Sequence, residues 1–194
     1  MILEQQLTEL YVDKKMSVKE VASSLGCSIN KVIYWMNKYG MERRTISEAI
    51  YHKHNPDGDP FTLHPINSLR RAKLYGLGIG LYWGEGTRAN KHSIRLGNTD
   101  PALLRAFSDF LVELFGVQRS DFRFGLQLFT DIDPDVALEY WAEELNVNKS
   151  QFYRTHITIS GSLGTYRKKS KYGVATLYYH NKKLRDILVG MLPR

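Results

Sequence analysis

The stretch that most constrains the fold is "GLGIGLYWGEG", residues 76–86, in which glycine recurs every fourth position at Gly76, Gly80 and Gly84. At 3.6 residues per turn, these three glycines lie on one face of a helix. A dinucleotide-binding G-x-G-x-x-G turn would need glycine in place of Leu81, so that interpretation fails. Each glycine inside a helix costs about 1 kcal/mol relative to alanine. We therefore expect this face to be a packing surface for another backbone.

The same stretch ends on a carboxylate in an unfavourable place. Glu85 falls at the C-terminal end of the expected helix, where the negative end of the helix dipole repels it. Placements that break a local rule concentrate at functional sites. Glu85 is therefore a candidate functional residue.

Residues 78–86, "GIGLYWGEG", resemble the nine-residue signature of the LAGLIDADG homing endonuclease family. In that family two such helices pack side by side, and the acidic residue near each helix end binds the divalent metal that cleaves DNA. The resemblance implies that Glu85 is the metal ligand and a catalytic residue. One motif per chain implies a homodimer that shares Mg²⁺, or another divalent cation, between its subunits. Trp83 stands where the family has a second acid, and the implied helix contacts are Gly76, Gly80 and Gly84.

Residues 1–46 contain the start and stop signals of three short helices. Ser17 and Glu20 form a capping-box pattern, Gly26 is suited to a tight turn, Ser28 offers the next cap and Gly40 ends the last helix. Residues 16–40 resemble the helix-turn-helix of many bacterial and phage DNA-binding proteins. A three-helix packing module with a polar face is the alternative.

In a helix-turn-helix the second helix enters the major groove of DNA. Its polar and aromatic positions are therefore candidates for base and phosphate contacts. These candidates are Asn30, Lys31, Tyr34, Trp35, Asn37 and Lys38.

Residues 47–68 lack sustained periodicity and are predicted to be a linker. Histidines and aspartates occur here, but their spacing matches no zinc or EF-hand pattern. Strand and helix patterns then alternate through residues 69–194. Asp100–Pro101 and Asp133–Pro134 each open a helix, and four strand patterns cover residues 93–98, 122–132, 152–160 and 173–180. We predict an α+β domain of LAGLIDADG type, with a mainly antiparallel sheet, preceded by an all-α helix-turn-helix domain.

The LAGLIDADG sheet lies on DNA, so the strand residues that face outward are the expected contacts. Alternation places Ile94, Leu96, Ile157 and Ile159 inward together with residues 122, 124, 126 and 128. Ordinary exposed side chains on a half-buried sheet are the alternative. The outward set is Ser93, Arg95, Arg123, Gln127, His156 and Thr158.

Charge is concentrated near the C-terminus. Residues 149–194 contain 10 Lys and Arg against 1 Asp, whereas residues 99–148 contain 3 Arg against 10 acids. A concentrated basic region is typical of a polyanion partner. A solvated basic tail is the alternative, although "YGVATLYY" is too apolar for a tail. Phosphate contacts are expected at Arg167, Lys168, Lys169 and Lys171.

Together these patterns predict a sequence-specific protein that binds double-stranded DNA as a homodimer. The enzyme hypothesis is Mg²⁺-dependent phosphodiester hydrolysis by Glu85, assisted by Lys149 or Lys169. The alternative is a transcription regulator whose LAGLIDADG-like domain is catalytically inactive. The single cysteine, Cys27, and the lack of a signal-peptide pattern or an apolar run of about 20 residues predict a cytoplasmic protein without a membrane partner.

Overall fold

The computed structural model describes residues 1–159 and 170–193. The chain divides into two compact units, Met1–Pro60 and Phe61–Arg194. This division falls inside residues 47–68, the stretch predicted to link two domains. None of the described helices combines the length and the apolar character that crossing a membrane requires.

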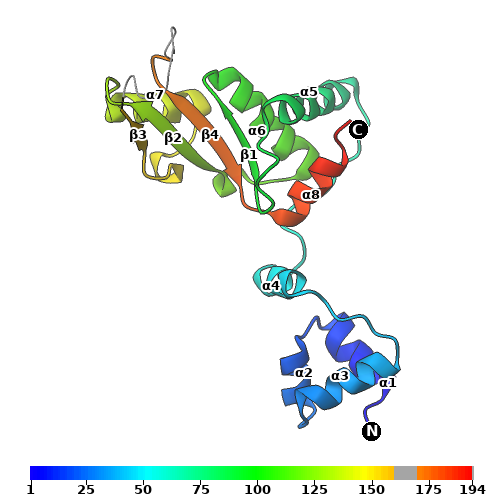
Figure 1. The fold of residues 1–194 in the computed structure, drawn as a ribbon. Helices are drawn as coiled ribbons and strands as arrows, with labels where there is room; N and C mark the ends of the chain where they lie inside the picture. The colour runs from blue at the N-terminus through cyan, green and yellow to red at the C-terminus, as the bar shows by residue number, and fades with distance from the viewer. Residues whose placement is uncertain (160–169, 194) are drawn as a thin grey trace. The chain divides into compact units, whose positions relative to one another are not determined.

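The N-terminal unit is built from short helices. They are α1 (Glu4–Leu7), the π-helical η1 (Thr8–Asp13), α2 (Val18–Ser24), α3 (Ile29–Lys38) and α4 (Ile46–His54) (Figure 1).

Helices α2 and α3 begin and end as their sequence predicts. The Ser17 hydroxyl accepts a hydrogen bond from the amide of Glu20, whose carboxylate accepts one from the amide of Ser17. Ser28 caps α3, and Gly26 makes the turn between the helices at φ +57°. The helices are held together by a small core that includes Leu7, Val21, Val32 and Met36, all fully buried.

Arg44 fastens the segment after α3 to the rest of the N-terminal unit. Its guanidinium donates to the backbone carbonyls of Tyr11, Lys15 and Met16 and lies 4.2 Å from the centre of the Tyr11 ring. The Arg44 amide also donates to the Tyr11 hydroxyl. This arginine is therefore a structural residue, and it is not free to contact a partner.

Helix α4 covers the first residues of the stretch 47–68, which was predicted to be a linker without periodic structure. Thr45 and Glu48 form a capping box at its start. Its apolar residues Ile46 and Ile50 are exposed, so the helix has no buried stripe within its unit. A helix that is started by its cap and lacks an apolar face gives no periodic signal.

The C-terminal unit alternates helices with strands. Its elements are α5 (Leu69–Glu85), β1 (Ile94–Asn98), α6 (Pro101–Phe115), η2 (Arg119–Asp121), β2 (Arg123–Phe129), α7 (Pro134–Leu145), η3 (Lys149–Gln151), β3 (His156–Thr158), β4 (Val174–Tyr179) and α8 (Lys182–Gly190).

The predicted helix boundaries of this unit are confirmed at α6 and α7. Asp100 caps α6 with Pro101 in its first turn, and Gly116 ends it at φ +62°. Asp133 caps α7 in the same way, with Pro134 in its first turn. The unit also includes part of the predicted linker, because the amide of Thr62 donates to the carbonyl of Phe115 at the end of α6.

The four strands form one mixed sheet in the order β1–β4–β2–β3. The pairs β1–β4 and β4–β2 are antiparallel, whereas β3 runs parallel to β2. The α+β class is therefore confirmed, but the sheet is mixed because its short edge strand is parallel. The strand β4 is central, so residues near the end of the chain pair with both earlier strands.

Helices cover one face of the sheet, and among the described residues no helix covers the other, which is called the open face (Figure 1). Helices α5, α6 and α8 pack against β1, and α6 also packs against β4 (Figure 1). Burial alternates strictly along β4, in which Ala175, Leu177 and Tyr179 are buried while the residues between them are half-buried. The core of the unit lies between this covered face and the helices. Its largest buried side chains include Tyr82, Phe107, Phe110, Phe122, Phe124 and Trp141.

Candidate nucleic-acid interface and the end of helix α5

The open face of the sheet carries a row of polar and aromatic side chains across three strands. The strand register places Arg95 of β1 opposite Tyr178 of β4, and Tyr178 opposite Arg123 of β2. In a second row, the exposed Gln127 of β2 lies between Val174 of β4 and His156 of β3. The strand pairing therefore brings the predicted contacts Arg95, Arg123 and Gln127 to one surface.

Between these two rows, two of the three paired residues of β1, β4 and β2 are glycines. Thr176 lies between Gly97 of β1 and Gly125 of β2. A Cβ atom at Gly97 would lie 2.8 Å from Thr176 Oγ1, and one at Gly125 would lie 3.0 Å from Cε2 of Tyr178. Glycine at these positions allows Thr176 and Tyr178 to lie close over the sheet.

An aromatic cluster covers one end of the open face. The Tyr178 ring stacks on the His180 imidazole with a centroid separation of 6.0 Å and an interplanar angle of 13°. The Tyr153 hydroxyl lies 2.7 Å from Nε2 of His180, and its ring meets Tyr178 edge-on at 5.6 Å. The Arg95 guanidinium lies 5.1 Å from the centre of the Tyr178 ring. Arginine and aromatic side chains are thus interleaved on this face.

Both arginines of the face are held by neutral partners. Arg95 Nε donates to the Ser93 hydroxyl at 2.9 Å, and that hydroxyl is within 3.0 Å of Asn90 Oδ1. Arg123 donates to the carbonyls of Ser120 and Phe122. Within residues 1–159 and 170–193, neither guanidinium forms an ion pair with a carboxylate.

Several basic side chains on the helices, in contrast, form ion pairs with carboxylates. Arg105 of α6 pairs with Glu144 of α7, and Arg119 pairs with Asp109. Other such pairs among the described residues include Arg70–Glu113, Lys149–Glu139 and Lys182–Asp186. The open face therefore carries uncompensated positive charge, whereas much of the charge on the helices is compensated locally.

The positive charge of the open face affects the pKa of His180. Burial, and then the charges of Arg95 and Arg123, lower the pKa of its imidazole below the usual histidine value. Each of these effects disfavours the protonated form, since a cation loses solvation on burial and is repelled by other cations. The free protein thus holds His180 neutral near pH 7.

The predicted inward and outward alternation is correct for β1 and β2 and wrong in part elsewhere. Ser93 is buried because it supports Arg95. Ile157 and Ile159 are 49% and 71% exposed, although Ile157 is in register with the buried Leu128. They lie at the edge strand, where less of the core covers them. Thr158 is half-buried.

Tyr153, Tyr178 and His180 were not predicted as part of the interface. The alternation of β4 gives a signal for two of them, because Tyr178 and His180 flank the buried Tyr179. Tyr153 lies before β3 and gives no such signal. Its proximity to His180 depends on the pairing of β2 with both β3 and β4.

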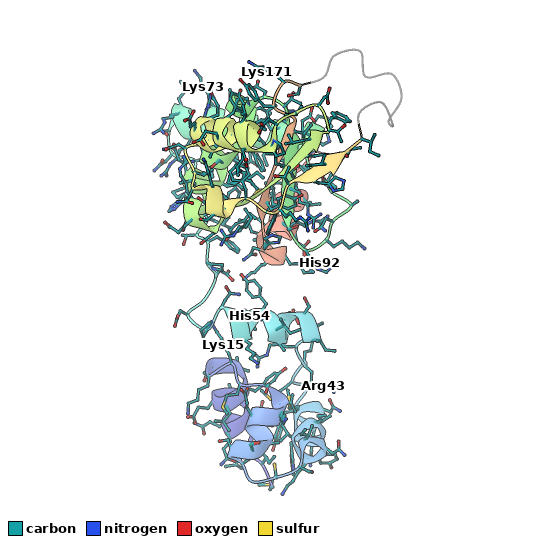
Figure 2. All side chains as sticks on the ribbon, turned by 90° about the vertical axis from the view of Figure 1, so that its left-hand side faces the viewer. Lys15, Arg43, His54, Lys73, His92 and Lys171 are labelled. Atoms are coloured by element: carbon teal, nitrogen blue, oxygen red, sulfur yellow. The ribbon has the colours of Figure 1, made fainter. Side chains whose placement is uncertain are left out.

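On the N-terminal unit, α3 presents the side chains expected of a recognition helix. Trp35 is half-buried, stacks on Tyr39 at 5.6 Å and lies under the Lys38 ammonium at 4.7 Å. The predicted contacts that are exposed are Asn30, Lys31, Tyr34, Asn37 and Lys38. Basic side chains elsewhere on this unit include Lys15 and Arg43, both exposed (Figure 2).

Helix α5 has two glycine faces with different surroundings. A Cβ atom at Gly78 would lie 2.1 Å from the Phe110 ring, so this glycine lets α5 approach α6 closely. Gly76, Gly80 and Gly84 are exposed, and a Cβ atom at any of them would meet nothing within 4 Å. The expected packing face is therefore unoccupied within the described part of the chain.

Glu85 is the last residue of α5 and is exposed. The residue after it bridges to β1, because Gly86 pairs with Leu96, and Arg185 of α8 donates to the carbonyl of Arg88 at 2.7 Å. These contacts fix the loop that follows Glu85. The described residues contain no group of three His, Cys, Asp or Glu suited to a metal ion. A hard cation needs several oxygen ligands, so beside Glu85 the others would come from water, from substrate phosphates or from a second copy of the chain.

Tyr82 supports this helix end from the core. It is fully buried, and its ring stacks on Phe107 at 5.8 Å with an interplanar angle of 8°. Burial raises the pKa of its hydroxyl, partly opposed by the nearby charge of Arg185. Trp83, the departure from the family signature, is 51% exposed. It therefore adds apolar surface beside the glycine face.

The structure does not bring Lys149 to Glu85. Lys149 belongs to η3 and pairs with Glu139 of α7, near the β3 edge of the sheet, whereas Glu85 precedes the β1 edge. Of the predicted basic loop, Lys171 is exposed and lies 5.0 Å from the Tyr172 ring centre (Figure 2). Tyr172 is held by its stacking on Tyr140 at 3.7 Å. The candidates Arg167, Lys168 and Lys169 lie outside the described residues.

Comparison of the chain with protein-family models, with curated proteins and with solved structures finds no match.

Proposed function

We propose that the protein binds double-stranded DNA through the open face of its sheet and through helix α3. The observation that carries this proposal is the uncompensated charge of Arg95 and Arg123, set among Tyr153 and Tyr178 on a surface that the helices leave uncovered. Phosphates supply the negatively charged partners that these guanidinium groups lack among the described residues. We place the protein in the cytoplasm, whose reducing conditions suit the free thiol of Cys27.

Helix α3 supplies the second part of the proposal. Asn30 and Asn37 are amides that can read adenine edges, while Lys31 and Lys38 are suited to phosphates. We assign base recognition chiefly to this helix, because its side-chain amides are exposed.

The glycine face of α5 supports a homodimer of LAGLIDADG type. Gly76, Gly80 and Gly84 leave space for a second backbone, and the exposed Leu77 and Trp83 provide apolar surface next to them. Two-fold pairing of this face with itself would bring two copies of Glu85 together.

With two copies, Glu85 and its symmetry mate are the groups that would hold Mg²⁺. The bound ion supplies Lewis-acid chemistry for phosphodiester hydrolysis. In this arrangement Arg185 fixes the loop after Glu85, and Arg95 and Arg123 hold the DNA backbone. The second candidate function is a transcription regulator without cleavage, which is favoured by Trp83 at the position where the resembled signature has a second acid.

Replacing both Arg95 and Arg123 by glutamine tests the DNA-binding face. We expect affinity for a duplex of mixed sequence to fall about tenfold or more, because two charged contacts to phosphate are lost. The slope of log affinity against log salt should decrease in magnitude by about 2. Fluorescence anisotropy titrations at several salt concentrations measure both quantities.

The matched control replaces Arg105 and Arg119 by glutamine. It changes the net charge equally, but both arginines are paired with carboxylates on the helices. Its affinity and salt slope should stay close to those of the wild-type protein. Equal losses in the two double variants would show that only net charge matters and that the open face is not the DNA-binding surface.

A further inference from the structure

His180 lies where a bound phosphate would change its charge state. It follows β4 on the open face, stacks on Tyr178 and lies 2.7 Å from the Tyr153 hydroxyl. The charged groups that act on its imidazole are Arg95 from β1 and Arg123 from β2. Among the described residues, the titratable groups in contact with it are thus Tyr153 and Tyr178, and the charges acting on it are those of two arginines.

We propose that His180 is a proton-linked contact of the open face, so that DNA binding takes up a proton at this imidazole and strengthens as the pH falls. This inference rests on the proposed DNA-binding function and specifies how that surface is regulated. Phosphates that pair with Arg95 and Arg123 offset the positive field at His180. A nearby phosphate also attracts the imidazolium directly.

The contact with Tyr153 is compatible with both states of the imidazole. When His180 is neutral with its proton on Nδ1, Nε2 accepts a hydrogen bond from the Tyr153 hydroxyl. When a proton from solvent is added at Nε2, that N–H donates to the Tyr153 oxygen instead. Protonation therefore reverses the direction of this hydrogen bond without breaking it.

The sign of the effect follows from linkage. In the free protein the pKa of His180 is lowered by burial and by the two arginines. If DNA raises that pKa, the complex binds more protons than the free protein between the two pKa values. Affinity must then rise as the pH falls through the pKa of the complex, and it must level off below the pKa of the free protein.

The test uses the full chain and a fluorescent duplex of mixed sequence at constant ionic strength. We expect the wild-type protein to bind several-fold more tightly at about pH 5.5 than at about pH 8. If the pKa rises by one unit, the gain approaches a limit of about tenfold below the pKa of the free protein. His180→Gln should remove most of this pH dependence. The control His92→Gln changes an exposed histidine in the loop between α5 and β1 and should keep it (Figure 2).

An NMR titration of the His180 imidazole in the wild-type chain, with and without the duplex, measures the same linkage without a substitution. A higher pKa in the complex supports the proposal. Binding with an unchanged His180 pKa, or with equal pH profiles in wild type and His180→Gln, overturns the linkage while leaving DNA binding intact. No binding of the duplex at low salt overturns both this inference and the proposed function.

Discussion

Replacing Glu85 by glutamine is expected to abolish Mg²⁺-dependent cleavage of DNA by the dimer, with a loss of at least about 100-fold. The substitution preserves the shape of the side chain but removes the negative charge that would hold the ion. DNA affinity should be unchanged or slightly higher, because an exposed carboxylate near the phosphates is lost. A gel assay with a duplex library in Mg²⁺, combined with anisotropy for binding, separates these two effects.

The control for this variant is Glu143→Gln, which removes an exposed carboxylate from α7 and should leave cleavage intact. Cleavage that survives Glu85→Gln, or that proceeds in a chelator, would place the chemistry elsewhere. Binding without cleavage by the wild-type protein is the result expected of the regulator.

Substitutions at two glycines of α5 are expected to have different effects. Gly78→Ala places a Cβ atom 2.1 Å from the Phe110 ring. We expect it to destabilise the C-terminal unit by about 1–3 kcal/mol, as overpacking of a core does. Gly80→Leu adds a side chain in open space, so it should keep the fold while preventing close approach of a second α5. Denaturant unfolding and sedimentation velocity measure the two outcomes.

Gly190→Leu is the matched control for assembly. Gly190 is also a helical glycine with open space around it, but it belongs to α8. The control should remain a dimer while Gly80→Leu becomes a monomer. A wild-type protein that is monomeric both with and without DNA, or a dimeric Gly80→Leu, would rule out the shared-helix arrangement.

Local sequence signals located most of the elements. The order Asp100–Pro101 with Gly116 delimits α6, and Asp133–Pro134 opens α7, because caps and proline act within one helical turn. In β1 and β2, the alternation of apolar and polar residues correctly separated the buried residues from Arg95, Arg123 and Gln127. Such signals depend only on neighbouring residues.

The remaining features depend on contacts between distant segments. The parallel pairing of β3 with β2 follows from where the chain returns after α7, and no residue of β3 specifies it. The exposure of Ile157 and Ile159 results from this edge position. Helix α4 escaped detection because Ile46 and Ile50 are not buried within its unit.

The sequence likewise predicted the local features of the candidate site and missed those that depend on tertiary contacts. Arg95 and Arg123 were expected to face outward, but their alignment with Tyr178 requires β4 to lie between β1 and β2. The electrostatic contrast between unpaired arginines on the sheet and paired cations on the helices likewise depends on tertiary contacts. Lys149 was proposed near Glu85 from residue type alone, and the sheet order separates the two.

Selection of bound duplexes from a random-sequence library by the full-length protein tests the central claim most directly. We expect enrichment of a specific sequence arranged as an inverted repeat, because a two-fold symmetric dimer presents two copies of α3 and of the open face. The enriched duplex should bind more tightly than a scrambled duplex of the same length at the same salt concentration. Failure to enrich any sequence, with equal affinity for the selected and scrambled duplexes, would contradict sequence-specific DNA recognition by this protein.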